Sequence, residues 1–221
     1  MDVMEAMRAR HSVRSYEERP LRAEERAALQ AKVDEVNAAG GLHVQLVCDE
    51  PRAFDGLMAH YGKFSGVTNY LALVGRRADD LDERCGYFGE QLVLLAQQLG
   101  LNTCWVAMTY SKVKGAYELG PDERLVIVVA LGYGATQGVA HRSKAADAVS
   151  TTDEPGCAWF TAGVEAALLA PTAMNQQKFR FQKRGTQVSA SAGLGFYSKI
   201  DLGIAKLHFE LGAGRESFSW A

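Results

Sequence analysis

Five consecutive residues near the N-terminus, Arg10-His11-Ser12-Val13-Arg14, combine two guanidinium groups with a hydroxyl and an imidazole. These side chains suit a phosphate, because arginine forks pair with its oxygens and a serine hydroxyl adds a short charge-assisted hydrogen bond. A solvated basic helix end would have a similar composition, since cations also interact favourably with the helix dipole there. The residues alone therefore leave two alternatives open, a phosphate site and a basic helix terminus.

A second candidate lies in the C-terminal half, where residues 170–181 read APTAMNQQKFRF. Pro171 should break a helix, and an amide-rich loop then leads into an expected strand. Asn175 carries a hydrogen-bond donor and an acceptor together, which suits the imide edge of a heterocycle. An ordinary helix-to-strand turn would also use Asn. This segment therefore predicts either a loop that binds a heterocycle or a simple turn.

A third candidate is the apolar strand that ends in Gly132-Tyr133-Gly134. A strand followed by GxG raises the possibility of a dinucleotide-binding fold, but the next glycine is Gly138. The resulting GxGxxxG spacing, with no amphipathic helix after it, argues against that fold. Arg142 and Lys144 could instead add positive charge to the phosphate site.

A fourth segment, residues 99–108, reads LGLNTCWVAM. A buried helix should end at Gly100 and lead into an extended segment, whose backbone N–H groups near Ala107 and Met108 could face a ligand. Taken alone, the segment is structural, and Cys104 is most simply a small buried hydrophobic residue.

Composition excludes several classes of function. The 24 Lys and Arg residues nearly balance 26 Asp and Glu residues, so no strong basic field favours nucleic acid or an anionic membrane. The longest aliphatic run, residues 125–131, is far shorter than the ~20 residues that span a bilayer. No secretory signal, CxxC pair or HExxH motif is evident, so we expect no metal site and a location in the reducing cytoplasm.

The helices and strands that should position these segments are predicted from the spacing of hydrophobic residues and from helix-capping residues. Asp2 and Glu5 form a capping-box pattern that starts a first helix. Residues 86–99 are apolar on almost every face, which predicts a helix buried in a core or a subunit interface. The interleaved helices and strands indicate one α+β domain over residues 1–221. The other expected elements are helices over 22–39, 111–119, 160–169 and 202–211, strands over 42–48, 69–74 and 125–131, a loop over 132–155, and a hairpin of 179–182 with 187–191.

Together these segments resemble the nitroreductase family of FMN flavoproteins. RHSVRSYEERPL is similar to the family's R-x-S-x-R signature, and APTAMNQQKFRF to its A-P-S-x-x-N-x-Q-P-W-x-F motif. GEQLVLLAQQLGLNTCWVAM resembles its central helix with the LGLxSCW ending, and VVALGYG with HRSK resembles its LGYP strand and the basic residues that follow. The resemblance implies a nitroreductase-like α+β fold, with a central, mostly antiparallel sheet packed by helices.

The chain departs from the usual family pattern in two places. In most members the Asn motif follows the N-terminal signature within several tens of residues, whereas here it begins only at Ala170. Lys178 also replaces the usual proline. The chain therefore resembles a branch of the family that carries this motif in its C-terminal half.

The resemblance implies FMN as the cofactor and NAD(P)H as the co-substrate. The flavin itself performs the chemistry by ping-pong hydride transfer, so no catalytic side chain is expected. The implied phosphate ligands are Arg10, Ser12, Arg14, Arg142 and Lys144, with His11 beside the ribityl chain. The implied ring contacts are Asn175 and Gln177, with Thr172 and Ala173 nearby, and a backbone N–H of Ala107 or Met108 at flavin N5.

The expected activity is reduction of nitroaromatic, quinone or similar small electron acceptors, by a homodimer with FMN at its interface. Two alternatives remain open. One is a non-catalytic flavin-binding or flavin-handling module, which would show no steady NAD(P)H oxidation. The other is a nicotinamide-only oxidoreductase built on Gly132 to Gly138, which would purify without colour.

Overall fold

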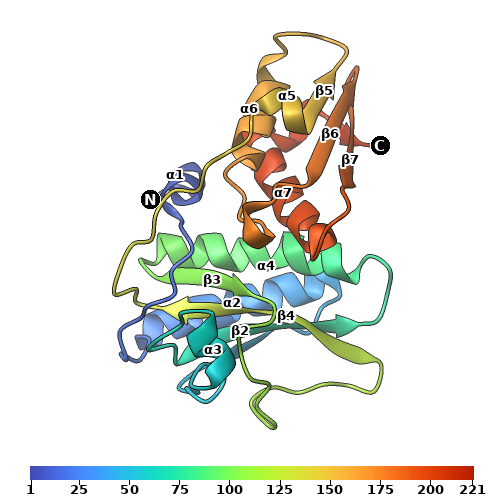
Figure 1. The fold of residues 1–221 in the computed structure, drawn as a ribbon. Helices are drawn as coiled ribbons and strands as arrows, with labels where there is room; N and C mark the ends of the chain where they lie inside the picture. Colours follow the sequence, from blue (N-terminus) through green and yellow to red (C-terminus); the bar gives the residue numbers. More distant parts are fainter. The chain divides into compact units, whose positions relative to one another are not determined.

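Two four-stranded sheets, each with its own helices, make up the fold (Figure 1). The computed structural model describes all of residues 1–221, and the chain divides into two units. Unit 1 consists of Met1–Leu81 and Gln91–Ala140, and unit 2 of Asp82–Glu90 and His141–Ala221. The single domain expected over residues 1–221 stays a prediction.

The sheet of unit 1 is antiparallel throughout and has the order β1-β2-β4-β3. Strand β4 is central to it, because it pairs with β2 on one side and with β3 on the other. The strands are β1 (Gln45–Val47), β2 (Asn69–Arg76), β3 (Asn102–Val106) and β4 (Glu123–Gly132). The helices of unit 1 are α1 (Val3–Ala9), α2 (Ala23–Gly40), α3 (Leu57–Tyr61) and the second half of α4 (Leu81–Gln98).

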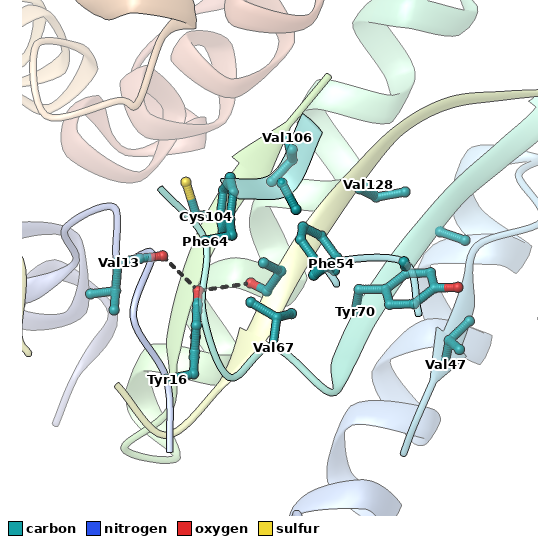
Figure 2. Packing of buried hydrophobic residues seen from close by; sticks show 14 of the residues in the cluster. Val13, Tyr16, Val47, Phe54, Phe64, Val67, Tyr70, Cys104, Val106 and Val128 are labelled. Atoms are coloured by element: carbon teal, nitrogen blue, oxygen red, sulfur yellow. Dashed lines mark hydrogen bonds between the residues drawn. The ribbon is translucent and has the colours of Figure 1, made fainter. Parts of the chain in front are cut away.

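Apolar side chains from the segment after α1, from the four strands and from the residues between β1 and β2 form a core of unit 1 (Figure 2). Strand β2 is buried from Asn69 to Gly75 without alternation, as expected for a strand covered on both faces. Tyr16 anchors the segment after α1, since its hydroxyl donates to the carbonyl of Val13 at 2.8 Å and lies 3.4 Å from that of Ala130 in β4. The core therefore fixes the chain immediately after the basic N-terminal segment.

The sheet of unit 2 is mixed and has the order β5-β6-β7-β8. Strands β6 and β7 form the antiparallel hairpin expected from the sequence, and β5 and β8 add to its two edges in parallel. Phe181 of β6 stacks on Phe209 of α7, with ring centroids 4.7 Å apart. The strands are β5 (Ser150–Thr152), β6 (Phe179–Arg184), β7 (Gln187–Ala192) and β8 (Ser219–Trp220). The helices are α5 (Ala146–Val149), α6 (Ala158–Ala167), α7 (Ser198–Ala213), the 3₁₀ turns η1 (Ala173–Asn175) and η2 (Arg215–Ser217), and the first half of α4.

Most of the elements predicted from the sequence are present. The capping box of Asp2 and Glu5 is confirmed, and α2 ends before Gly41, whose φ of 57° is left-handed. Helix α4 begins earlier than predicted, at Leu81. Strand β1 is shorter than the predicted run over 42–48.

Two predictions about segments between these elements are wrong. Residues 111–119 form no helix, because Gly115 has a left-handed φ of 82° and backbone groups bond elsewhere. Ser111 N–H donates to the carbonyl of Ala53 at 2.7 Å, and Glu118 N–H to the side chain of Gln45 at 2.7 Å. Residues 132–155 are not one long loop, because they contain α5 and also β5, which pairs with β6.

Within unit 2, the first half of α4 and α7 approach closely enough for their backbones to touch. A Cβ atom on Gly86 of α4 would lie 2.1 Å from the carbonyl oxygen of Ile200. A Cβ atom on Gly203 of α7 would lie 2.0 Å from the carbonyl oxygen of Glu83. Both distances are far below van der Waals contact, so only glycine fits at this crossing.

We predict that Gly203→Ala destabilises the protein by about 1–3 kcal/mol, the usual effect of overpacking. In a helix without this contact, the same change would stabilise by up to about 1 kcal/mol, because alanine has the higher helix propensity. The sign of the change in the free energy of unfolding, measured in urea, therefore shows whether Gly203 lies at a close helix crossing. A stabilised variant would show that the two helices do not meet at this glycine.

Candidate functional site

The basic segment of unit 1 lies along the edge of β3. Arg10 caps the C-terminus of α1, and Ser12 then forms a parallel β-bridge with Thr103. The N–H of Val13 donates to the carbonyl of Thr103 at 3.0 Å. Val13 is buried in the core, whereas Ser12 and Arg14 are exposed. Extended backbone with alternating side chains therefore places the hydroxyl and the second guanidinium together on the outer face.

Charged and polar groups of this segment converge on Cys104 of β3. Burial raises the pKa of the Cys104 thiol, while Arg14, a hydrogen bond with Ser12, and Arg10 act in the opposite direction. The Arg10 side chain is buried, and the Arg14 guanidinium lies 5.9 Å from the centre of the Phe64 ring. The structure thus brings together Arg10, Ser12 and Arg14, three of the expected phosphate ligands.

The glycine-containing segment after β4 lies beside the same residues. Tyr16 forms a bridge with Gly134, and Gly138 has a left-handed φ of 69°. A Cβ atom on Gly138 would lie 2.8 Å from the Cβ atom of His11. The glycines of this segment therefore allow a close approach of two backbone segments in unit 1.

Ala107 and Met108 lie where the chain leaves β3. Strand β3 ends at Val106, and residues 107–110 form a bend. The Met108 side chain is 66% exposed, while Ala107 is half-buried. These two residues continue the strand that borders the basic segment.

In unit 2, the candidate residues Thr172–Gln177 form a turn with unusual backbone geometry. Met174, Asn175 and Gln177 have φ values of 50°, 52° and 44°, all left-handed. Such conformations cost a non-glycine residue about 1–3 kcal/mol and persist only where the surroundings impose them. This concentration of left-handed residues therefore requires specific contacts to hold it.

Gln177 supplies several of these contacts, and its side chain is buried, at 2% exposure. Its Nε2 donates to the carbonyl of Arg142 at 2.9 Å and to Oδ1 of Asn175 at 2.7 Å. Its Oε1 accepts from the N–H of Lys144 at 2.8 Å, and its own N–H donates to Oγ1 of Thr172 at 3.0 Å. Gln177 therefore connects the turn to the segment that follows His141.

Lys144 and Asn175 complete this connection. The ammonium of Lys144 donates to the carbonyls of Gln176 at 2.8 Å and Gln177 at 3.0 Å. Nδ2 of Asn175 donates to the carbonyl of Arg142 at 2.8 Å. The structure thus brings together the six candidates of unit 2, which are Arg142, Lys144, Thr172, Ala173, Asn175 and Gln177.

Asp201 in the first turn of α7 was not expected from the sequence, although it lies against the turn. Its Oδ1 accepts from the N–H of Ala173 at 3.0 Å, and its Oδ2 from Nε2 of Gln176 at 2.7 Å. The side chain is 3% exposed, and burial raises the pKa of Asp201 to about 6, against the effect of the two hydrogen bonds. An acidic residue near a helix N-terminus is common, so its type and position gave no signal of this role.

Other kinds of site are not evident. The structure contains no group of three or more His, Cys, Asp or Glu side chains placed to hold a metal ion. None of its helices has the length and apolar character needed to cross a membrane.

The two sheets and their covering helices define an α+β protein. A family model described as "Putative TM nitroreductase" matches residues 2–213. The chain belongs to this nitroreductase family, which indicates an oxidoreductase, and the predicted family and fold class are confirmed. No curated protein is similar enough to match the chain.

Solved structures with similar folds include three that cover different shares of the chain. A "putative nitroreductase" from Thermotoga maritima has 24% identity and a TM-score of 0.67, covering 98% of this chain and 85% of its own. A "putative nitroreductase in complex with FMN" from Desulfovibrio desulfuricans has 21% identity and a TM-score of 0.52, covering 67% and 95%. A "putative NADH dehydrogenase/NAD(P)H nitroreductase" from Bacteroides thetaiotaomicron has 19% identity and a TM-score of 0.50, covering 66% and 95%. At these identities the likeness concerns the fold.

The raised pKa of Asp201 predicts a pH-dependent stability. Because the folded pKa of about 6 exceeds the ordinary value of 3.8, the stabilising effect of this group is complete below about pH 4. It is lost as the pH rises through about 6, and a shift of about two units corresponds to about 3 kcal/mol. Asp201→Asn stays neutral, so the unfolding free energy of wild type minus variant should fall by about 2–3 kcal/mol between pH ~4 and ~7.

Urea unfolding at several pH values measures this difference. Glu165→Gln, which removes the charge of an exposed carboxylate on α6, is the matched control. A wild-type-minus-variant difference that does not change with pH would contradict the raised pKa.

Proposed function

We propose that the chain is an FMN-dependent NAD(P)H oxidoreductase that reduces nitroaromatic, quinone or similar small electron acceptors. The observation behind this proposal is the cluster of Arg10, Ser12 and Arg14 on the edge of β3, in a chain of the nitroreductase family. A dianionic phosphate needs fixed cations and hydroxyl donors, and this cluster has both. The FMN complex of the Desulfovibrio desulfuricans protein adds support at the level of the fold.

Each unit, taken by itself, has residues that suit FMN. In unit 1, Arg10, Ser12 and Arg14 would bind the phosphate, with His11 beside the ribityl chain and Ala107 and Met108 offering backbone N–H groups. In unit 2, Arg142 and the third N–H of Lys144 would offer positive charge to a phosphate, because Lys144 uses two of its donors within the turn. When bound, FMN would supply the redox chemistry, accepting hydride from NAD(P)H and passing it to the acceptor.

Asn175 is the side chain of the turn best suited to the flavin ring. It is exposed, and its amide makes one donated and one accepted hydrogen bond, to Arg142 and Gln177. One N–H and one lone pair therefore remain for a heterocycle. Gln177 is buried and both hydrogens of its Nε2 are used, so we assign it to holding Asn175, with Thr172 and Ala173 shaping the turn.

The finer properties of the proposed enzyme rest on the resemblance and the composition. We propose a homodimer, as the resemblance implies. Leu92 and Val93 of α4 are already fully buried within one chain, so the apolar character of this helix no longer requires a partner. We also propose a cytoplasmic location, in keeping with the absence of disulfide bonds among the four cysteines.

The cofactor and the activity can be tested together. Protein purified, or reconstituted with FMN and desalted, should show a flavin absorption band, and denaturation should release FMN. It should then oxidise NADH or NADPH steadily in the presence of a nitroarene or a quinone. A flavin band without turnover would indicate a flavin-handling module, and no flavin binding at all would overturn the proposal.

We predict that Arg14→Ala weakens FMN binding while leaving the protein folded. Losing one charge-assisted contact should cost about 1.5–3 kcal/mol, or roughly 10–150-fold in affinity. Arg8→Ala, which removes an exposed arginine of α1, is the matched control and should bind FMN as wild type does. Titration by flavin fluorescence gives both affinities, and equal affinities for wild type and Arg14→Ala would exclude Arg14 from the phosphate site.

A further inference from the structure

Two sets of contacts hold the turn Thr172–Gln177 in unit 2. Gln177, Lys144 and Arg142 hold it through the amide connections described above. Separately, Asp201 of α7 binds the N–H of Ala173 and the amide of Gln176. The left-handed residues Met174 and Asn175 lie in the sequence between Ala173 and Gln176, the two residues that Asp201 binds.

Gln176 extends the second set of contacts to another loop. Its Nε2 donates one hydrogen to Asp201 and the other to the carbonyl of Phe196 at 2.8 Å. A Cβ atom on Gly195 would lie 2.5 Å from Oε1 of Gln176, so this loop packs directly on the amide. Asp201 therefore organises the turn directly and, through Gln176, fixes it against residues 193–197.

Burying the charge of the Asp201 carboxylate costs free energy that a neutral acceptor would not cost. The carboxylate is buried, and its hydrogen bonds from Ala173 and Gln176 come from neutral amide groups, whereas a buried carboxylate is usually matched by a cation. An asparagine would offer an acceptor to Ala173 without a buried charge. Groups whose ionisation is disfavoured by their environment concentrate at functional sites, and backbone strain does so as well. Both features occur here in neighbouring residues, because Asp201 binds Ala173 and Gln176, and the left-handed Met174 and Asn175 lie between these two in the sequence.

We propose that Asp201 is a positioning residue for flavin binding, which holds the Thr172–Gln177 turn in the conformation that presents Asn175. The inference rests on the proposed function. Without Asp201, the left-handed residues lose one anchor and relax toward ordinary conformations in a fraction of molecules. FMN then binds more weakly by that fraction, because only the ordered turn is competent.

The test compares FMN affinity and the midpoint potential of bound FMN in four proteins. If Asp201→Ala leaves about one molecule in ten with an ordered turn, its FMN affinity falls about tenfold, and the potential shifts as Asn175 leaves its place. Asp201→Asn keeps an acceptor for the N–H of Ala173 but places an NH₂ group opposite Nε2 of Gln176, so its affinity should lie between those of Asp201→Ala and wild type. Glu165→Ala, which removes an exposed carboxylate of α6, controls for the lost charge.

Gln176→Ala keeps the proposal testable if Asp201→Ala does not fold. It breaks the bridge to Phe196 while leaving the carboxylate in place, and should weaken FMN binding in the same direction. Wild-type affinity and potential in both Asp201→Ala and Gln176→Ala would overturn the inference, as would an equal loss in Glu165→Ala. An Asp201→Asn variant as impaired as Asp201→Ala would also overturn it, since charge and not position would then matter. Failure of wild type to bind FMN would instead overturn the proposed function.

Discussion

The placement of the basic segment in unit 1 depends on an open sheet edge. In the order β1-β2-β4-β3, strand β3 has only one strand neighbour, and its other edge would present unpaired N–H and C=O groups. Ser12 and Val13 cover part of that edge by pairing with Thr103. The backbone pairing that provides hydrogen-bond partners for this edge of β3 also fixes the direction in which the side chains of Ser12 and Arg14 point. Pairing of these two segments thus meets a structural requirement of the sheet and also aligns the candidate residues Ser12 and Arg14.

Unit 2 positions its candidate residues by a different physical device. There the turn Thr172–Gln177 has no strand pairing and three left-handed non-glycine residues. Side-chain amides, an ammonium and a carboxylate supply the hydrogen bonds that a ladder would otherwise provide. Such a turn is rigid only while these partners are present, which makes residues outside the motif, such as Asp201, as important to its shape as those within it.

The sequence was informative where local rules and tertiary packing agree. The buried strands β2 and β4, the β6-β7 hairpin and the capped helix α1 could all be predicted, because apolar runs, alternation and capping residues act locally. The helix predicted over 111–119 was wrong because contacts with Ala53 and Gln45 take its backbone groups. Arg10, Ser12 and Arg14 could be selected because their spacing is itself the signal. Asp201 could not, because its partner Ala173 is distant in sequence and only folding brings the two together.

Three consecutive amides show most clearly what the sequence leaves undetermined. Asn175, Gln176 and Gln177 have similar chemistry, and the resemblance implied ring contacts for Asn175 and Gln177 without separating their roles. In the fold, Gln177 is buried and holds the segment after His141, whereas Gln176 bridges Asp201 and Phe196. Asn175 is exposed and keeps one hydrogen-bond donor and one acceptor beyond its bonds with Arg142 and Gln177. The role of each amide is therefore set by which carbonyl or carboxylate lies within its reach, a property of the fold and not of the motif.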